Sequence, residues 1–281
     1  MSRPDFTTIT YSDSYVGQAR YWRPAGQPRG AVLYLHGIQS HGGWFEGSAC
    51  RLAAAGLHVL LPDRRGSGLN EQERGHVRSA GRLLLDVVEA TAWLKGKAGA
   101  GRVHLVGVSW GGKLALAAAM RQAGDVDRLV LVAPGLFPQV DLTARQKAAV
   151  AVAAMLRPRR LFDIPLNEPE LFTDNPVRQA FIRDDPLRLR QATARFLFAS
   201  RMLDAQVRRQ ARRREWPFAV TFILAGRERI IDNERTKRFA RRLCCRQVRI
   251  TEHAQAAHTL EFEPDPQAYY QDLVEAVMSD E

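Results

Sequence analysis

Ser109 stands at the centre of residues 107–111, which have the pattern G-x-S-x-G. An apolar run, Val103 to Val106, precedes this pentapeptide, and an alanine-rich stretch, Leu114 to Met120, follows it. The succession predicts a strand, a sharp turn and a helix, with glycines small enough to let the chain double back. Such a turn raises the serine hydroxyl above a sheet, at a helix N-terminus that favours developing negative charge. The pattern therefore predicts a nucleophilic serine; a glycine-rich turn that merely contains a serine is the alternative.

A serine hydroxyl is a weak nucleophile and needs a general base, which in turn needs an orienting carboxylate. The chain offers seven histidines. His58 and His104 fall at the starts of predicted strands, on the opposite edge of the sheet from Ser109, and we expect them to be structural. His258 follows the last predicted strand, in a loop that can run back over the carboxyl edge, so it is the expected base. His253 is the alternative, although it lies too close to the strand end to swing over the serine.

The orienting acid is expected after the apolar run 218–225, which gives the chain order serine, acid, histidine. Two carboxylates follow that run, Glu228 and Asp232. Glu228 stands directly after the closing turn of the strand, and we assign it as the acid. Asp232 is one helical turn further along and is the alternative acid, or else the cap of a helix that starts near Asn233. A surface salt bridge is the structural alternative for Glu228.

Acyl transfer at a serine also needs donors for the oxyanion of the tetrahedral intermediate. The backbone N–H of Trp110, directly after Ser109, is the first expected donor. The second is expected in the loop after the buried strand that closes with His36 and Gly37, where the backbone N–H of Ile38 is the candidate. We expect His36 to stabilise this loop rather than to take part in the chemistry.

Buried strands alternate with helices in the first half of the chain. Apolar runs predict strands at 30–37, 58–63, 103–108 and 129–132, and helical patterns lie between them at 44–56, 83–94 and 114–120. A loosely alternating stretch, 6–23, predicts an opening β-hairpin. Crossovers of about 20–30 residues are typical of βαβ units, so we expect an α/β fold with a mostly parallel, doubly wound sheet. Sites on such sheets lie at the carboxyl ends of the strands, where the residues named above fall.

The strand rhythm breaks from Phe137 to about Pro217. Helical patterns occupy 143–156, 175–182 and 187–211, with proline-bearing connections between them. The rhythm then resumes with a strand at 218–225, a helix at 233–243, a short strand at 247–251 and a closing helix at 265–278. We therefore predict a first part of the core at 1–135, an inserted helical lid at 136–217 and a second part of the core at 218–281.

The chain of 281 residues has a formal net charge of +11, which comes almost wholly from arginine. Residues 138–215 hold 16 Lys/Arg against 9 Asp/Glu, so the predicted lid carries +7 of it. Because basic and acidic residues are interspersed, and no zinc-finger spacing or RNA-binding aromatic signature is present, we expect no nucleic-acid partner. An apolar helical stretch at 148–156, followed by three arginines, can rest weakly on an anionic bilayer. The alternative is that this helix packs its apolar face on the core.

The composition predicts a cytoplasmic protein, with weak contact of the lid with the inner membrane surface as a further option. No window is apolar over the length needed to span a membrane, and the polar residues 1–5 contain no signal-peptide core. Three cysteines, with Cys244 and Cys245 adjacent, form neither a disulfide framework nor a metal-ligand spacing. We expect no metal and no organic cofactor.

Several stretches, spread over nearly the whole chain, occur in the order of one known family. They are 35–38 with 41–43, 62–68, 107–111, 132–134, 185–187, 225–229 and 257–261. In them the chain resembles the serine-dependent α/β-hydrolases of the monoacylglycerol lipase and lysophospholipase group. The resemblance implies the α/β-hydrolase fold, with nucleophile, acid and base at Ser109, Glu228 and His258. Two departures are that the family's acid is usually aspartate, which keeps Asp232 open, and that Trp110 is bulky enough to narrow the acyl pocket.

The resemblance implies hydrolysis of a carboxylic ester through an acyl-enzyme intermediate, with a monoacylglycerol or lysophospholipid as the substrate. A thioesterase or a small-ester carboxylesterase is the alternative within serine chemistry. Relatives that open epoxides or remove halogens use an aspartate as the nucleophile. The serine at position 109 argues against both of these activities. The alternative of another class is a non-catalytic α/β-hydrolase scaffold that serves as a binding protein; it would lack a member of the triad.

Overall fold

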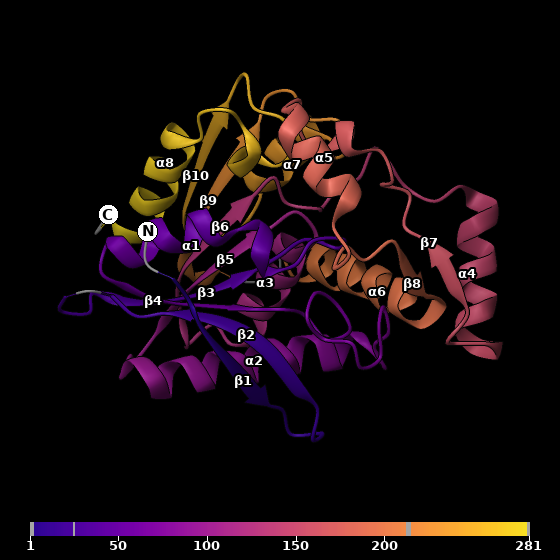
Figure 1. Cartoon of the computed structure of the whole chain (residues 1–281), viewed down its shortest axis with the longest axis horizontal. Coiled ribbons are helices and arrows are strands. Elements are labelled where there is room, and N and C mark those ends of the chain that lie inside the picture. The colour runs from indigo at the N-terminus through magenta and orange to yellow at the C-terminus, as the bar shows by residue number, and fades with distance from the viewer. Residues whose placement is uncertain (1–2, 25, 212–214, 280–281) are drawn as a thin grey trace.

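A single eight-stranded sheet forms the centre of the molecule in the computed structural model, which describes residues 3–24, 26–211 and 215–279 (Figure 1). Its strand order is β1-β2-β4-β3-β5-β6-β9-β10. The strands are β1 (Asp5–Thr10), β2 (Val16–Trp22), β3 (Gly30–Leu35), β4 (Leu57–Pro62), β5 (Val103–Val108), β6 (Val126–Val132), β9 (Trp216–Ala225) and β10 (Cys245–His253). The strand β2 is antiparallel to both β1 and β4, and all pairs from β4 to β10 are parallel. The predicted α/β class with a mostly parallel sheet is confirmed.

Helices cover both faces of the sheet, which explains why its central strands are apolar without alternation. The helices around the sheet are α1 (Glu46–Ala54), α2 (Ala80–Ala98), α3 (Trp110–Arg121), α7 (Asn233–Ala240) and α8 (Gln267–Met278). In the sheet, β4 lies beside β3 towards the β1 edge, whereas β5 lies beside β3 towards the β10 edge. The connections from β3 to β4 and from β4 to β5 therefore run in opposite directions across the sheet. Since such crossovers are right-handed, α1 lies on one face, and α2 and α3 lie on the other. Contacts of α1 with α8, and of α2 with α3, complete the two layers.

The helix α3 is buried on all sides, because it lies between the sheet and both α2 and α6 (Ala194–Gln210). Every residue from Trp110 to Met120 is buried. A helix that is enclosed in this way has no polar face, which accounts for the alanine-rich sequence. Lys113 is the one charged residue in this stretch, and its place in the site is described below.

The segment between β6 and β9 contains α4 (Ala144–Leu156), β7 (Leu161–Asp163), α5 (Pro176–Asp184), β8 (Gln191–Thr193) and α6. In Figure 1 these elements lie together beyond one end of the sheet. The helix predicted at 187–211 begins only at Ala194, because residues 191–193 form a strand that pairs antiparallel with β7. Thr193 then caps α6, since its side chain accepts from the N–H of Phe196. The sequence analysis missed this two-stranded sheet because three residues are too few to show alternation.

The helix α4 packs on α6 with one side only. Ala153 and Ala154 are buried against Ala194. Met155 and Leu156, in contrast, are 82% and 75% exposed. One side of this helix is therefore packed on α6, and contact of its exposed side with a bilayer stays a prediction. No helix in the described part of the chain is long and apolar enough to cross a membrane.

Candidate active site

Ser109 lies at the carboxyl end of β5, on the turn into α3. Its backbone has φ +52° and ψ −123°, a conformation that L-residues rarely adopt and that marks stored strain. The turn is held by its own hydrogen bonds, because the Ser109 carbonyl accepts from the N–H groups of Gly112 at 2.9 Å and Gly135 at 2.7 Å. A Cβ at Gly107 or Gly111 would come within 2.6 or 2.3 Å of a backbone oxygen. Both glycines are therefore required for the turn that carries the serine.

The side chains of Ser109, His258 and Glu228 form one continuous chain of hydrogen bonds. His258 Nε2 lies 2.9 Å from Ser109 Oγ, and His258 Nδ1 lies 2.8 Å from Glu228 Oε2. The side chains of His258 and Glu228 are each only 2% exposed. Glu228 Oε1 also accepts from the N–H groups of Ile230 at 2.8 Å and Ile231 at 3.3 Å. The turn after β9 thus aims the carboxylate at the imidazole.

The alternative acid and the alternative base have other partners. Asp232 is the N-cap of α7, where its carboxylate accepts from the N–H of Arg235 at 2.8 Å. His253 is the last residue of β10, and its Nε2 lies 3.0 Å from an oxygen of Asp272 on α8. The geometry therefore brings Glu228, and not Asp232, to His258. His58 and His104 lie near the starts of β4 and β5, as expected.

The loop after β3 lies against the nucleophile. A Cβ at Gly37 would be 3.5 Å from the Cβ of Ser109. His36 Nδ1 lies 2.8 Å from the Gly37 carbonyl and donates to it, while His36 Nε2 accepts from the N–H of Arg64 at 2.9 Å. In a trans peptide the carbonyl of Gly37 and the N–H of Ile38 point in opposite directions. His36 therefore fixes the direction of the expected oxyanion donor.

The two bonds of His36 require a neutral imidazole with its proton on Nδ1. Burial, assisted by the nearby charge of Arg64, lowers the pKa of His36 to about 3. The other expected donor, the N–H of Trp110, belongs to the first turn of α3, where N–H groups lack an intrahelical acceptor. Ile38, Ser109 and Trp110 line the same cavity. One expected oxyanion donor thus lies in the loop after β3 and the other at the start of α3, and both residues line the cavity together with the serine.

Asp185, whose motif contributes to the family resemblance, ties the segment between β6 and β9 to the loop after β3. Its Oδ2 accepts from His41 Nε2 at 3.0 Å and from Trp44 Nε1 at 2.7 Å. Its Oδ1 accepts from the N–H of Leu187 at 2.9 Å. Burial alone would raise the pKa of Asp185, but the hydrogen bonds from His41 and Trp44 outweigh it and hold the pKa below its usual value. The sequence analysis did not foresee this tether.

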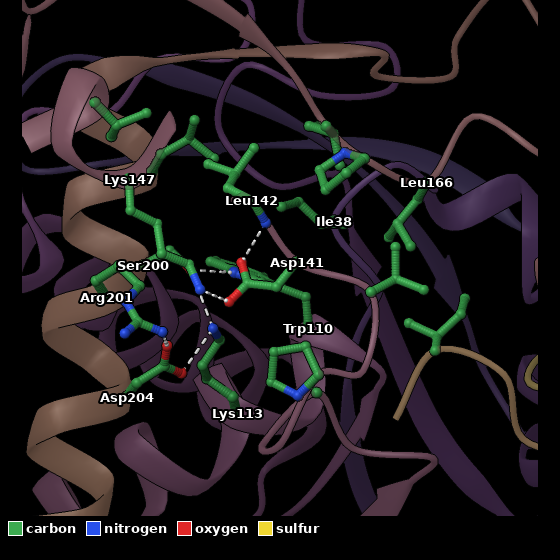
Figure 2. A pocket seen from close by; sticks show the side chains of 18 of the residues that line it. Ile38, Trp110, Lys113, Asp141, Leu142, Lys147, Leu166, Ser200, Arg201 and Asp204 are labelled. Atoms are coloured by element: carbon green, nitrogen blue, oxygen red, sulfur yellow. Dashed lines mark hydrogen bonds and ion pairs between the residues drawn. The ribbon is translucent and has the colours of Figure 1, made fainter. Parts of the chain in front are cut away.

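A cavity of about 320 Å³ opens beside Ser109 (Figure 2). One part of its lining is apolar and includes Ile38, Val140, Ile164, Leu166, Leu197 and Ile231. The other part is polar and includes Lys113, Asp141, Lys147, Ser200, Arg201 and Asp204. Trp110 stands between the two parts, stacked on Phe196 with its Nε1 donating to Ser200 Oγ at 2.9 Å. The indole therefore forms part of the cavity wall, and its expected narrowing of an acyl pocket stays a prediction.

The polar wall of the cavity was not predicted. Its signal in the sequence was Lys113, a lone lysine in the apolar stretch after the pentapeptide. Its partners Ser200 and Asp204 lie about ninety residues further along, so no local pattern joins them. Among the described residues, no group of three or more His, Cys, Asp or Glu side chains could hold a metal ion.

The sequence pattern of the α/β-hydrolase family described as Serine aminopeptidase, S33, matches residues 26–265. The chain therefore belongs to this family. Among characterised relatives, the monoglyceride lipase of Homo sapiens is 27% identical over 203 residues, which are 72% of this chain and 66% of that protein. The monoacylglycerol lipase of Mycolicibacterium smegmatis is 30% identical over 172 residues, 59% of each chain. The chain thus matches somewhat less than two thirds of the length of these relatives.

Solved structures agree with this assignment at the level of the fold. The monoacylglycerol lipase of Paleococcus ferrophilus has a TM-score of 0.80 at 21% identity, over 92% of this chain and 99% of that one. A soluble variant of the monoglyceride lipase of Saccharomyces cerevisiae, in complex with a substrate analog, has a TM-score of 0.82 at 16% identity, over 99% and 97%. The α/β-hydrolase fold implied by the sequence resemblance is confirmed.

Proposed function

We propose that the chain is a serine hydrolase that cleaves carboxylic esters through an acyl-enzyme intermediate. The observation that carries the proposal is the unbroken hydrogen-bond chain from Ser109 Oγ through His258 to Glu228. Ser109 attacks the ester carbonyl while His258 Nε2 takes the hydroxyl proton and then gives it to the departing alcohol. Glu228 holds the imidazole tautomer and stabilises the imidazolium that forms. A water molecule, activated by His258 in the same way, releases the acid.

In this mechanism the negative charge on the substrate oxygen is met by the backbone N–H groups of Ile38 and Trp110. The bond from His36 to the Gly37 carbonyl supports this role, because it orients the Ile38 N–H before the substrate arrives. Preorganised donors of this kind typically contribute a factor of about 10²–10³ each to the rate. A scaffold that only binds ligands has no need for a strained serine, a buried base and an orienting acid in one chain.

We propose a monoacylglycerol or a lysophospholipid as the substrate. The relatives support this class, because the characterised proteins named above are monoglyceride lipases. The apolar part of the cavity, formed by Ile38, Leu166 and their neighbours, suits an aliphatic chain. The substrate is tested with p-nitrophenyl esters of graded chain length, beside a monoacylglycerol and lysophosphatidylcholine. A preference for thioesters or for acetate esters over all of these lipids would replace the lipid assignment.

The catalytic role is tested by labelling with a fluorophosphonate probe, which reacts with an activated serine. The folded wild type is expected to label, and Ser109→Ala is expected not to label. Ser40→Ala is the matched control, since Ser40 lies in the loop after β3 but has no place in the hydrogen-bond chain. Failure of the folded wild type to label at Ser109 would remove the enzyme proposal.

We further propose that the protein works in the cytoplasm and that α4 makes weak contact with an anionic membrane surface. Its exposed residues Met155 and Leu156 are followed by the basic segment 157–160, the combination that favours a lipid interface. Sedimentation with vesicles should show binding that rises with the anionic lipid fraction. Met155→Glu should weaken it, whereas Val177→Glu, at a similarly exposed position on α5, should not. Binding that ignores anionic lipid would contradict the proposal.

A further inference from the structure

The polar wall of the cavity is organised around a buried ion pair. Lys113 Nζ lies 2.8 Å from Asp204 Oδ1, and Arg201 Nη1 lies 3.6 Å from the other oxygen of Asp204 (Figure 2). The residues Lys113 and Asp204 are only 5% and 7% exposed. Charges are costly to bury in this way, and an apolar pair of the same volume would be at least as stable. A cavity that binds only an aliphatic chain does not require buried charges such as those of Lys113 and Asp204.

Two hydrogen-bond donors in this wall, on Ser200 and Lys113, have no acceptor in the described part of the chain and are free to bind a ligand. Ser200 Oγ accepts from Trp110 Nε1 at 2.9 Å and from Lys113 Nζ at 3.0 Å. Because a hydroxyl accepts two hydrogen bonds and donates one, its own proton must point away from both donors. The ammonium of Lys113 uses two of its three N–H groups on Asp204 and Ser200. The Ser200 hydroxyl and the third ammonium N–H have no further acceptor among the described residues, and both side chains line the cavity.

The charges of the wall favour a negatively charged ligand group. Lys147 Nζ lies 2.6 Å from Asp141 Oδ2, so that pair is neutral as a whole. Lys113 and Arg201 share the single carboxylate of Asp204, which leaves one positive charge in excess. One anionic group in the cavity would balance it, whereas a cation would add to it.

The position of Lys113 sets how far this group lies from the ester. It lies in the first turn of α3, four residues after Ser109, which is the N-cap of that helix, and both residues line the cavity. Because an α-helix rises about 5.4 Å per turn, the ammonium group belongs to the part of the wall near the nucleophile. We propose that the cavity binds esters that carry an anionic oxygen group, a carboxylate or a phosphate, a few bonds from the scissile carbonyl, with Lys113 and Ser200 as its donors. This specificity rests on the proposed ester hydrolysis. The group can belong to the acyl part, as a terminal carboxylate, or to the alcohol part, as a glycerol phosphate.

Binding to the Ser109→Ala protein tests the proposal without turnover. Two ester pairs differ only in the anionic group: monoethyl adipate against ethyl hexanoate, and 1-butyrylglycerol 3-phosphate against 1-butyrylglycerol. Calorimetry should give about tenfold tighter binding of the anionic member in at least one pair, since hydrogen bonds to charged groups are the stronger ones. The pair that shows the preference identifies the part of the substrate that carries the charge. Equal or weaker binding of the anionic member in both pairs overturns the proposal.

Variants of the wall connect the preference to the named residues. Lys113→Met/Arg201→Met/Asp204→Leu, made in the Ser109→Ala background, removes both cations together with the carboxylate that they share, so the excess positive charge is gone and no member of the group is left without its partner. It should reduce the preference to about twofold or less. Lys95→Met/Asp125→Leu removes an ion pair between the end of α2 and the loop before β6, and should keep the preference. Ser200→Ala, which changes no charge, should lower the preference about threefold and serves if the triple variant is unfolded. An undiminished preference in the folded triple variant, or in Ser200→Ala, overturns the proposal.

The two proposals fail in different ways. Wild type that binds the anionic esters but neither hydrolyses them nor labels with the fluorophosphonate overturns the ester hydrolysis and leaves the anion site in place. Wild type that labels and hydrolyses both members of each pair with equal kcat/KM overturns the anion site alone. A selective loss of kcat/KM for the anionic esters in the triple variant, made in the wild-type background, supports both.

Discussion

The choice between two carboxylates shows what decides the role of a single residue. Glu228 and Asp232 lie four positions apart, and each accepts hydrogen bonds from backbone N–H groups. The carboxylate of Asp232 caps the start of α7, whereas the second carboxylate oxygen of Glu228 lies 2.8 Å from His258 Nδ1. The additional methylene of glutamate gives the reach that a shorter acid at this position would lack.

Glu228→Gln should therefore lower kcat by about 10²–10⁴, because the amide no longer holds the catalytic tautomer of His258 or stabilises the imidazolium. Asp232→Asn should leave kcat within a factor of about two, since asparagine caps a helix nearly as well as aspartate. Steady-state kinetics on one p-nitrophenyl ester measures both. Wild-type activity in Glu228→Gln, together with its loss in Asp232→Asn, would transfer the role to Asp232.

At the scale of elements, two short connections do most of the positioning. The turn from β5 to α3 exposes the serine because glycines let α3 start within van der Waals contact of the loop after β3. The segment before β8 is fixed to that loop through Asp185, whose partners His41 and Trp44 follow β3. Both connections converge on the end of β3 and the loop after it, which also supplies Ile38.

Gly111→Ala should destabilise the fold by about 3 kcal/mol or more, because the new Cβ would lie 2.3 Å from the backbone oxygen of Leu35. Gly96→Ala is the matched control, as it adds the same methyl group in the interior of α2 with nothing within 4 Å. It should stabilise by about 0.5–1 kcal/mol through helix propensity. Urea unfolding followed by circular dichroism measures both, and equal midpoints would contradict the geometry of the turn.

Asp185→Ala should cost about 3 kcal/mol of stability, because it leaves the buried His41 and Trp44 donors without their acceptor. Asp184→Ala, one residue earlier and exposed, should change stability by less than about 0.5 kcal/mol. Limited proteolysis adds a second measurement, since loss of the tether should expose the segment between β6 and β9 first. Identical digestion of both variants would show that Asp185 is not a tether.

At the scale of the whole molecule, burial of ionisable groups makes stability depend on pH in two opposing directions. Burial lowers the pKa of His36 to about 3, whereas burial raises the pKa of Glu261 to about 7. The contribution of neutral His36 is complete above its ordinary pKa of 6.5 and is lost as the pH falls towards 3. The contribution of protonated Glu261 is complete below 4.5 and is lost as the pH rises through 7. Their opposition flattens the wild-type profile.

A single variant separates the two effects. His36→Gln should be destabilised relative to wild type at pH 8, and this difference should shrink by about 2 kcal/mol at pH 5, because wild type alone then loses the contribution of neutral His36. Urea unfolding of both proteins at the two pH values provides the measurement. A destabilisation by His36→Gln that is equal at pH 5 and pH 8 would contradict a buried, neutral imidazole.

The sequence by itself determined the parallel sheet, the turn that carries Ser109 and the order in which serine, acid and histidine follow one another. These features depend on short-range patterns, namely apolar runs that form buried strands, glycines beside the serine, and polar residues in the loops directly after the strands. The sequence did not predict the two-stranded sheet of β7 and β8 or the start of α6 at Ala194. Both depend on pairing between segments about thirty residues apart, which no local pattern reports.

Only the tertiary structure decided that Glu228 rather than Asp232 lies at His258, since both follow β9 within a few residues and only their contacts show which carboxylate reaches the imidazole. It alone also joined Lys113 to Ser200 and Asp204, which come from helices about ninety residues apart. Sequence periodicity reports which residues are buried along one element. Which buried charges meet depends on how two elements pack, and that packing brings Lys113, Ser200 and Asp204 together in the wall of the cavity beside the nucleophile.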